Sequence, residues 1–336
     1  MMKWRTYIIV LVTILVANSL CAQQIPFSTQ YMVNPYAISP TLAGYTGYPE
    51  VFINYRADWT RIDGSPRTFR ANGHGNVYKD KLWLGGELLT DKAGVLSVFN
   101  ANLSLTYKLQ VENDQFIYFG IWTSFFQASA NIGDGIGIDP NDPVIQNNNK
   151  LNSSAFNMGF GINYNWQNFN FGLSMPASLG NSNEYELNSQ FKYRVQRQFQ
   201  VHASYMFDLG KQWQLQTIGL YRKTVKQPAT FELSLMSIYQ GRFWGGLLYR
   251  NSGVLAINLG GHVYNGFVLN YSYEMGLSNI NSGSGGSHEI TLGYRFKFKE
   301  NDYFNLNRTS TSGRKGRRSS GTSSYPEVQD YNYKRR

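Results

Sequence analysis

Apolar and polar residues alternate with a period of two in many segments of this chain. From Phe156 to Tyr164, aromatic or aliphatic side chains occupy the even positions and Asn or Gly the odd ones. The same alternation recurs over 99–109, 199–207, 267–275 and 290–298. Because successive side chains of a β-strand point to opposite faces of a sheet, this period predicts strands with one apolar and one polar face. The pattern therefore predicts an all-β protein.

About fourteen strands are expected, and the connections between them differ in length. The alternation is weak in the third, fifth and ninth strands, so their bounds are the least defined. Connections after even-numbered strands are tight, whereas several after odd-numbered strands are long: 60–67, 130–153, 177–195 and 276–286. The approximate strand ranges are 50–59, 68–78, 81–90, 97–109, 115–129, 154–165, 168–176, 196–208, 211–222, 229–239, 241–250, 253–262, 265–275 and 287–299.

These features predict a closed antiparallel transmembrane β-barrel over 50–299 rather than a soluble sandwich, which alternation alone would fit equally well. Bacterial outer-membrane barrels have an even number of strands, short periplasmic turns and longer outer loops, and aromatic residues gather near their strand ends. Lipid offers no hydrogen bonds to an open edge strand, so the ring of strands must close. We therefore expect an outer-membrane location, with both chain termini in the periplasm.

The composition supports this class. Charged residues make up 15% of the chain, against about 25% in an average soluble domain. Aromatic residues also make up 15%, supplied mainly by 24 Tyr and 21 Phe. After the first 22 residues, no segment approaches the length of about 18 consecutive apolar residues that a membrane-spanning helix requires.

The first 22 residues have the layout of a secretory signal peptide. Lys3 and Arg5 precede a short apolar run at 8–16, and we expect cleavage after Ala22. Cleavage removes Cys21, which is the only cysteine in the sequence, so the exported chain is expected to use no disulfide. The residues before Cys21 form a poor lipoprotein signal, which makes a lipid anchor the less favoured alternative.

Most of the positive charge lies at the C-terminus. Residues 306–336 contain eight Lys or Arg and two Asp or Glu, which accounts for +6 of the formal net charge of +10. An exported chain with a nearly neutral body is not expected to bind nucleic acid, despite its high overall charge. The polar, low-complexity segment 300–336 is predicted to be a disordered periplasmic tail, either simply solvated or tethered to an acidic partner.

Residues 23–49 do not alternate and precede the first strand. Pro35, Pro40, Gly44, Gly47 and Pro49 give this segment turn chemistry. We expect it to fold back and close the barrel as a plug, or to dock a partner in the periplasm.

Several charged residues occupy the polar face of the predicted strands. The first, second and fourteenth strands are neighbours in a closed ring, so Arg56, Arg70, Glu289 and Arg295 are candidates to lock a plug. The alternative is that these charges only line water or pair with one another across the lumen. The complete set expected to face inward is Arg56, Asp58, Arg70, Lys108, Glu274, Glu289, Arg295 and Lys297.

No set of residues predicts catalysis, a cofactor or a metal. His74, His202 and His262 are expected to face the lumen, and Ser204 lies two residues from His202, at roughly 6–7 Å along a strand. That separation is too long for a nucleophile–base pair. The acidic loop at 133–142 lacks the ligand spacing of an EF-hand, which leaves only a loose surface Ca²⁺ site as an alternative.

Motifs spread over the chain resemble the PorP/SprF family of outer-membrane proteins of the type IX secretion system. They begin with Gln-Tyr-Met-Val-Asn-Pro-Tyr-Ala-Ile-Ser-Pro-Thr-Leu-Ala-Gly at 30–44 and end with the strand-like motif at 288–296. Between them lie Tyr-Arg-Ala-Asp-Trp at 55–59, Asp-Gly-Ser-Pro-Arg-Thr at 63–68, Asp-Lys-Ala-Gly at 91–94 and Tyr107. The resemblance covers about 24–299 and leaves the basic tail outside.

The resemblance implies a non-enzymatic component, or a cargo-specific accessory, of protein export that in gliding bacteria serves motility and adhesin secretion. The implied partners are a periplasmic ring lipoprotein and a secreted cargo or adhesin, in addition to outer-membrane lipid. A porin or small-molecule transporter is the alternative function. The motif positions assigned to partner binding or plug locking are Asn34, Pro35, Arg56, Trp59, Gly64, Pro66, Asp91, Glu289 and Arg295.

Overall fold

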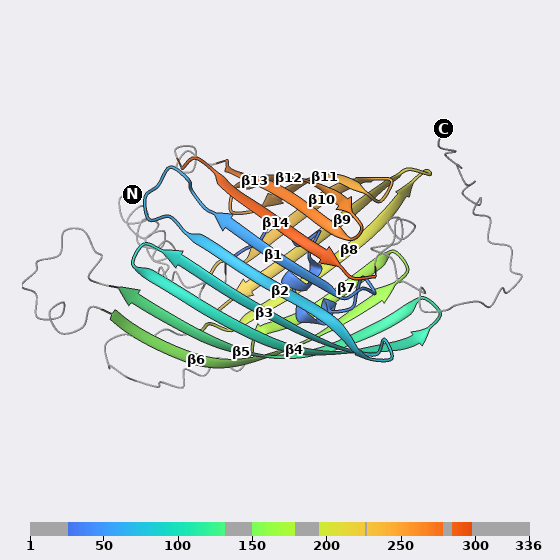
Figure 1. Cartoon of the computed structure of the whole chain (residues 1–336), viewed down its shortest axis with the longest axis horizontal. Helices are drawn as coiled ribbons and strands as arrows, with labels where there is room; N and C mark the ends of the chain where they lie inside the picture. Colours follow the sequence, from blue (N-terminus) through green and yellow to red (C-terminus); the bar gives the residue numbers. More distant parts are fainter. Residues whose placement is uncertain (1–25, 132–149, 179–194, 226, 278–283, 298–336) are drawn as a thin grey trace, which may run out of the picture.

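The protein is a closed barrel of fourteen antiparallel strands in a computed structural model that describes residues 26–131, 150–178, 195–225, 227–277 and 284–297 (Figure 1). The strands are β1 (Glu50–Ala57), β2 (Arg67–Tyr78), β3 (Leu82–Ala93), β4 (Leu96–Glu112), β5 (Gln115–Asn131), β6 (Lys150–Trp166), β7 (Phe169–Ala177), β8 (Gln198–Leu209), β9 (Trp213–Thr224), β10 (Thr230–Tyr239), β11 (Phe243–Arg250), β12 (Val254–Tyr264), β13 (Phe267–Gly276) and β14 (Ser287–Arg295).

Each strand pairs with its neighbours in sequence, and β1 closes the ring by pairing with β14. In that closing pair Arg56 lies opposite Glu289, and Glu50 lies opposite Arg295. The predicted closed, antiparallel, fourteen-stranded barrel is thus confirmed. The segments that join even-numbered to odd-numbered strands are short, and we call the end of the barrel that carries them the tight-turn end. The opposite end, which carries the connection at 58–66, is the long-loop end.

The strand bounds differ from the predicted ones mainly in β4, β6 and β14. The strand β4 continues to Glu112 and β6 begins at Lys150, because backbone pairing with β5 persists after the side-chain alternation fades. The strand β14 ends at Arg295, where its partner β1 begins. The predicted inward position of Lys297 is wrong, since this residue is exposed in a turn with φ of 61°.

The two faces of the strands differ as the alternation predicts. On β1, Val51, Ile53 and Tyr55 are exposed on the outer surface, whereas Asn54 and Arg56 are buried in the lumen. The outer surface is therefore apolar, as a lipid-facing surface requires, and the lumen is polar. No helix in the described ranges is both long and apolar enough to cross a membrane.

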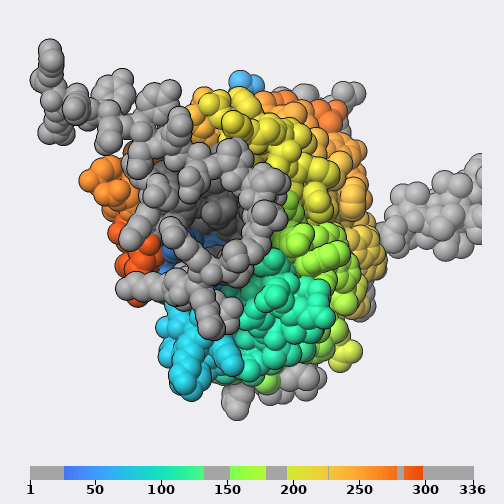
Figure 2. Space-filling view, turned by 90° about the vertical axis from the view of Figure 1, so that its right-hand side faces the viewer, coloured from blue at the N-terminus to red at the C-terminus, as the bar shows by residue number. Residues whose placement is uncertain are grey.

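The described part of the N-terminal segment, residues 26–49, runs through the lumen (Figure 1). It contains two short 3-10 helices, η1 (Pro35–Ala37) and η2 (Pro40–Leu42), and most of its side chains are buried. A view onto the tight-turn end shows the atoms of this segment, in blue, inside the ring of strands (Figure 2). We call residues 26–49 the lumen segment.

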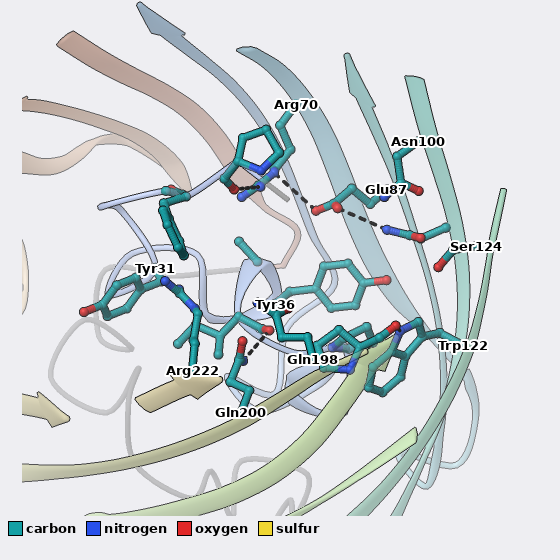
Figure 3. Close-up of a pocket in the computed structure, with 18 of the residues that line it drawn as sticks. Tyr31, Tyr36, Arg70, Glu87, Asn100, Trp122, Ser124, Gln198, Gln200 and Arg222 are labelled. Carbon is teal, nitrogen blue, oxygen red and sulfur yellow. Dashed lines mark hydrogen bonds and ion pairs between the residues drawn. The ribbon is translucent and has the colours of Figure 1, made fainter. Parts of the chain in front are cut away.

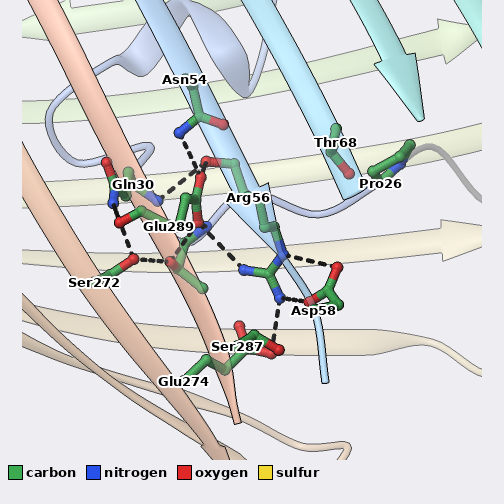
Figure 4. A network of polar contacts seen from close by, with 12 residues as sticks. Pro26, Gln30, Asn54, Arg56, Asp58, Thr68, Ser272, Glu274, Ser287 and Glu289 are labelled. Atoms are coloured by element: carbon green, nitrogen blue, oxygen red, sulfur yellow. Dashed lines mark hydrogen bonds and ion pairs between the residues drawn. The ribbon is translucent and has the colours of Figure 1, made fainter. Parts of the chain in front are cut away.

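The lumen segment passes from one end of the barrel to the other. Pro26 lies beside Arg70 and Thr68 near the long-loop end, and Pro49 leads into β1 at the tight-turn end (Figure 4). Lys297 also lies at the tight-turn end. The predicted signal peptide, the basic tail and the periplasmic placement of both termini concern residues 1–25 and 298–336, which lie outside the described residues.

Candidate functional site in the barrel lumen

Arg56 is the centre of a cluster of charges on the lumen wall near the long-loop end (Figure 4). Its guanidinium lies 2.6 Å from Asp58, 3.1 Å from Glu274 and 3.2 Å from Glu289. Asp58 directly follows β1, whereas Glu274 lies on β13 and Glu289 on β14, so Arg56 meets the two glutamates only because the ring closes. Arg56 is 5% exposed and Glu289 is 1% exposed. A buried charge is costly unless it is paired in this way.

Glu289 connects this cluster to the lumen segment. Its Oε2 accepts hydrogen bonds from the Thr29 backbone N–H at 2.9 Å and from the Thr29 hydroxyl at 2.7 Å. Its Oε1 accepts one from the Ser28 hydroxyl at 2.6 Å and one from Asn54 Nδ2 at 2.9 Å. Gln30 Nε2 donates to the backbone carbonyl of Glu289 at 2.7 Å. Glu289 therefore holds three consecutive residues of the lumen segment, two through its carboxylate and one through its backbone carbonyl.

Arg295 makes the corresponding contact near the tight-turn end. Its Nη2 donates to the Val33 carbonyl at 3.0 Å, and its Nε donates to Glu50 Oε1 at 2.6 Å. The other oxygen of Glu50 lies 3.2 Å from His74 Nε2. The lumen segment is thus held at two levels of the barrel by charged side chains of β14.

Further charges, which the sequence analysis did not include, extend the cluster around the wall. Glu232 pairs with Arg222 and lies 3.3 Å from Arg250, which in turn lies 3.5 Å from Glu274. The ring of Phe27 packs against both guanidinium groups, at 4.8 Å from Arg222 and 4.9 Å from Arg250. The ion pairs therefore run from β1 through β14, β13 and β11 to β10 and β9. The alternation of inward and outward side chains along a strand could have identified Glu232 and Arg250 as lumen-facing. These two residues lie opposite each other in the β10–β11 pair.

Tyrosines fix the middle of the lumen segment. Tyr31 hydrogen-bonds with Ser234 and Tyr36 with Ser104, both at 2.7 Å. Tyr45 is likewise buried and hydrogen-bonds with Ser204. Three tyrosines of the lumen segment are thus bonded to hydroxyl groups of the wall.

Close approach to the wall requires glycine at particular positions. Gly44 has φ of 77°, and a Cβ placed there would lie 2.3 Å from the Trp83 ring. On the wall, a Cβ at Gly120 would lie 2.8 Å from Thr41 Cγ2, and so would one at Gly161. Backbone of the lumen segment thus packs directly against the strands, with no room for a side chain between them.

The remaining motif positions divide between the lumen segment and the long-loop end. Asn34 Nδ2 donates to Asn72 Oδ1 at 3.0 Å, and Pro35 begins η1. Asp91 accepts a 2.6 Å hydrogen bond from the Thr68 hydroxyl. Trp59, 45% exposed, lies in the 58–66 connection. In the same connection the carbonyl oxygens of Gly64 and Pro66 accept backbone hydrogen bonds from Gly94 and Asp58. Trp59, Gly64, Pro66 and Asp91 make no described contact with the lumen segment.

A small cavity lies between the lumen segment and the wall (Figure 3). Its volume is ≈ 80 Å³, and its lining includes Tyr36, Glu87, Asn100, Trp122 and Gln200. At about 30 Å³ per water molecule, this volume suits a few waters and is well below the roughly 300–1,000 Å³ of a typical ligand pocket.

The residues considered for catalysis or metal binding have structural partners. His202 Nε2 lies 3.1 Å from the amide oxygens of both Asn163 and Asn170, and Ser204 hydrogen-bonds with Tyr45. Within the described ranges, no group of His, Cys, Asp or Glu residues is arranged to hold a metal ion. The acidic loop at 133–142 lies outside these ranges.

Fourteen strands, an apolar outer surface and a polar lumen define an outer-membrane-type β-barrel. A sequence profile of the family described as type IX secretion system membrane protein PorP/SprF matches residues 20–294. The chain therefore belongs to this family, and the resemblance inferred from its motifs is confirmed. The family is one of secretion membrane proteins and is not a known enzyme family.

Similar solved structures are other barrels, at low identity. The outer membrane protein Omp33 of Acinetobacter baumannii is 9% identical with a TM-score of 0.43, covering 75% of this chain and 98% of that one. The CymD monoaromatic hydrocarbon channel is 11% identical with a TM-score of 0.44, covering 82% and 94%. A Pseudomonas aeruginosa FadL homologue is 8% identical with a TM-score of 0.40, covering 74% and 90%. No match was found among curated proteins.

Proposed function

We propose that this protein is a non-enzymatic outer-membrane component, or cargo-specific accessory, of type IX secretion that acts by binding protein partners. The observation that carries the proposal is the filled lumen. The lumen segment occupies the barrel along its length and is held by Glu289 and Arg295. A barrel closed in this way is poorly suited to the passage of small solutes, so its exposed surfaces and loops become the functional parts.

Residues 23–49 act as the plug in this proposal, and Asn34, Pro35, Arg56, Glu289 and Arg295 lock it. The 58–66 connection, with Trp59, Gly64 and Pro66, supplies contacts to a partner outside the lumen. Asp91 of β3 holds the start of β2, next to this connection, through its hydrogen bond with Thr68.

The proposed topology follows the loop lengths. The tight-turn end faces the periplasm together with the basic tail at 300–336, and the signal peptide at 1–22 is removed on export. The proposed partners are a periplasmic ring lipoprotein at the tight-turn end and a secreted cargo or adhesin at the long-loop end.

A deletion strain tests the function. Deletion should retain at least one secreted or surface-displayed protein in the periplasm, while uptake of small solutes stays normal, and expression of the wild-type chain should restore secretion. Purified barrel in planar bilayers should show no steady conductance. Normal secretion combined with lost uptake of a small solute, or a large stable conductance, would instead identify a porin or transporter.

A further inference from the structure

The seam between β1 and β14 joins the two strands that lie farthest apart in the sequence. In the described ring, every other pair joins strands that follow each other along the chain. Asn54 and Glu289, which form a hydrogen bond across the seam, are 235 residues apart. Bringing distant residues together has an entropic cost that a local hairpin avoids. Closing the seam therefore carries the largest loop-closure cost among the strand pairs of the barrel.

The first part of the lumen segment binds the last two strands of the chain, on one side of the seam. The Thr29 hydroxyl bonds with Glu289 of β14 at 2.7 Å and with Ser272 of β13 at 2.9 Å. Gln30 Nε2 donates to the Ser272 hydroxyl at 3.0 Å and to the Glu289 carbonyl at 2.7 Å. All four residues are buried, and Figure 4 shows Gln30 beside Ser272 and Glu289.

The next part of the lumen segment binds strands on the other side of the seam. Asn34 Nδ2 donates to Asn72 of β2 at 3.0 Å, and the Tyr36 hydroxyl bonds with Ser104 of β4 at 2.7 Å. All four of these residues are buried as well. The lumen segment therefore bridges the seam from inside, from β13 and β14 to β2 and β4.

The ion pairs that cross the seam use the same residues of β14. Arg56 pairs with Glu289, and Glu50 pairs with Arg295, each directly across the β1–β14 register. Both β14 residues also form hydrogen bonds with the lumen segment. Burying such charges is favourable only when each of them has its partners. The seam and the lumen segment therefore satisfy the same buried groups, and we expect them to form in one step.

The packing disfavours the alternative, in which the lumen segment enters a barrel that has already closed. The segment joins β1 at the tight-turn end and its Pro26 end lies near the long-loop end, so it would have to thread along the whole lumen. A Cβ at Gly44 would overlap the Trp83 ring, and one at Gly120 would lie 2.8 Å from Thr41 Cγ2. A lumen that fits the segment this closely leaves little room for side chains to pass.

We propose that the lumen segment is an internal folding template, which closes the barrel by holding β13 and β14 beside β2 as the seam forms. The segment directly precedes β1, so docking it against β13 and β14 brings β1 close to β14 and raises the effective concentration of the two edges. After closure, the segment stays in the lumen as the plug. This role is independent of the proposed secretion function, because it concerns the folding of the purified chain.

The test follows closure of the seam while the full-length chain refolds from urea into detergent micelles. In a chain that lacks Cys21, Ile53→Cys with Leu292→Cys places a disulfide pair across the seam, and Ile53→Cys with Ala71→Cys places one in the β1–β2 hairpin. Residues directly opposite in antiparallel strands have a Cα separation that a disulfide accepts. Oxidant pulses at successive times then report closure of the seam, and the hairpin pair reports any general slowing of folding.

Variants on the two sides of the bridge should both slow closure. Thr29→Val removes the hydroxyl that binds β13 and β14, and Asn34→Ala removes the amide that binds β2. Each should slow cross-linking of the seam about tenfold, which corresponds to about 1.4 kcal/mol in the transition state of closure. Neither should slow cross-linking of the hairpin pair. Thr29→Ser keeps the hydroxyl and should close at the wild-type rate.

The control is Ser234→Ala, which removes a hydrogen bond between the lumen segment and β10, a strand that is not next to the seam. This control should accelerate unfolding and leave seam closure at the wild-type rate. Wild-type closure in either Thr29→Val or Asn34→Ala, with faster unfolding, would overturn the proposal, because the segment would then dock after the ring has closed. Equal slowing by Ser234→Ala, or of the hairpin pair, would also overturn it, since the effect would then be a general folding defect.

Discussion

Removing the charge of Glu289 should release the lumen segment without opening the barrel. Glu289→Gln keeps the shape of the side chain. Its amide oxygen can occupy the Oε2 position and keep both hydrogen bonds from Thr29, and its NH₂ group then faces the Ser28 hydroxyl, which can rotate to accept. On the wall, Arg56 keeps its contacts with Asp58 and Glu274 but loses its ion pair with Glu289, and the new NH₂ group faces Asn54 Nδ2, so that hydrogen bond is lost as well. The substitution therefore weakens both the charge cluster of the wall and the contacts that Glu289 makes with the lumen segment, and a variant of Glu274 separates the two effects.

The expected magnitude follows from those contacts. Three hydrogen bonds from Ser28 and Thr29 end on the carboxylate. A hydrogen bond to a charged group contributes about 1.5–3 kcal/mol, and one between neutral groups about 0.5–1.5 kcal/mol. Making all three neutral should therefore cost about 3 kcal/mol in the free energy that holds the segment in place. That loss raises the released population roughly 100-fold, since about 1.4 kcal/mol corresponds to a factor of ten.

A single engineered cysteine makes the release measurable. Ala43 is 0% exposed in the lumen segment, and Cys21 is the only native cysteine. In a chain that lacks Cys21, Ala43→Cys should react slowly with a maleimide, and Glu289→Gln should accelerate labelling about 100-fold. Glu274→Gln is the control, because Glu274 contacts Arg56 and Arg250 but makes no described hydrogen bond to the lumen segment. This control should lower the temperature at which heating unfolds the barrel and changes its migration on a gel, which we call the gel shift. Labelling of the control should stay slow.

Equal labelling of the Glu289 and Glu274 variants would refute this reasoning, because release would then follow general loosening of the barrel. Slow labelling of the Glu289 variant, with the wild-type gel shift, would show that the segment is held mainly by its apolar packing.

Three further substitutions or deletions address the segment, the tail and the outer connection. Gly44→Ala should lower the temperature of the gel shift more than Gly253→Ala, because both glycines have φ of 77° but only Gly44 would also clash with a ring; equal effects would contradict the close packing. Deleting 306–336 should leave membrane insertion of the barrel intact, because the closing strand precedes the tail. In the full-length protein, protease should reach the tail only when the periplasm is opened. Cleavage of the tail on intact cells would show that the proposed topology is the wrong way round. The double change Arg56→Ala with Trp59→Ala should weaken secretion if the first hairpin docks a partner. A lowered gel-shift temperature alone would indicate packing, since breaking a buried ion pair costs roughly 3–5 kcal/mol.

The alternation of side chains along the strands predicted which residues face the lumen. The prediction was correct for the charged residues that contact or support the lumen segment. Arg56, Glu289 and Arg295 were assigned inward positions on the first and last strands, and the closed ring makes Arg56 and Glu289 direct partners. The inward position predicted for Lys297 was wrong because side chains alternate between the two faces only within a strand, and β14 ends at Arg295. The path of the lumen segment was not predictable, since a segment without alternation carries no sign of the wall it will contact.

The sequence by itself determined the strands, their two faces and the closure of the ring. These follow from a period of two and from the need to pair every backbone group in lipid, both of which are local or general constraints. Only the tertiary structure decided which charges meet and where the lumen segment lies. Ser28 and Glu289 are 261 residues apart in sequence, and the pairing of Glu232 with Arg222 and Arg250 depends on the registers of three strands. Such contacts form only as the ring closes around the segment, so no short stretch of sequence contains them.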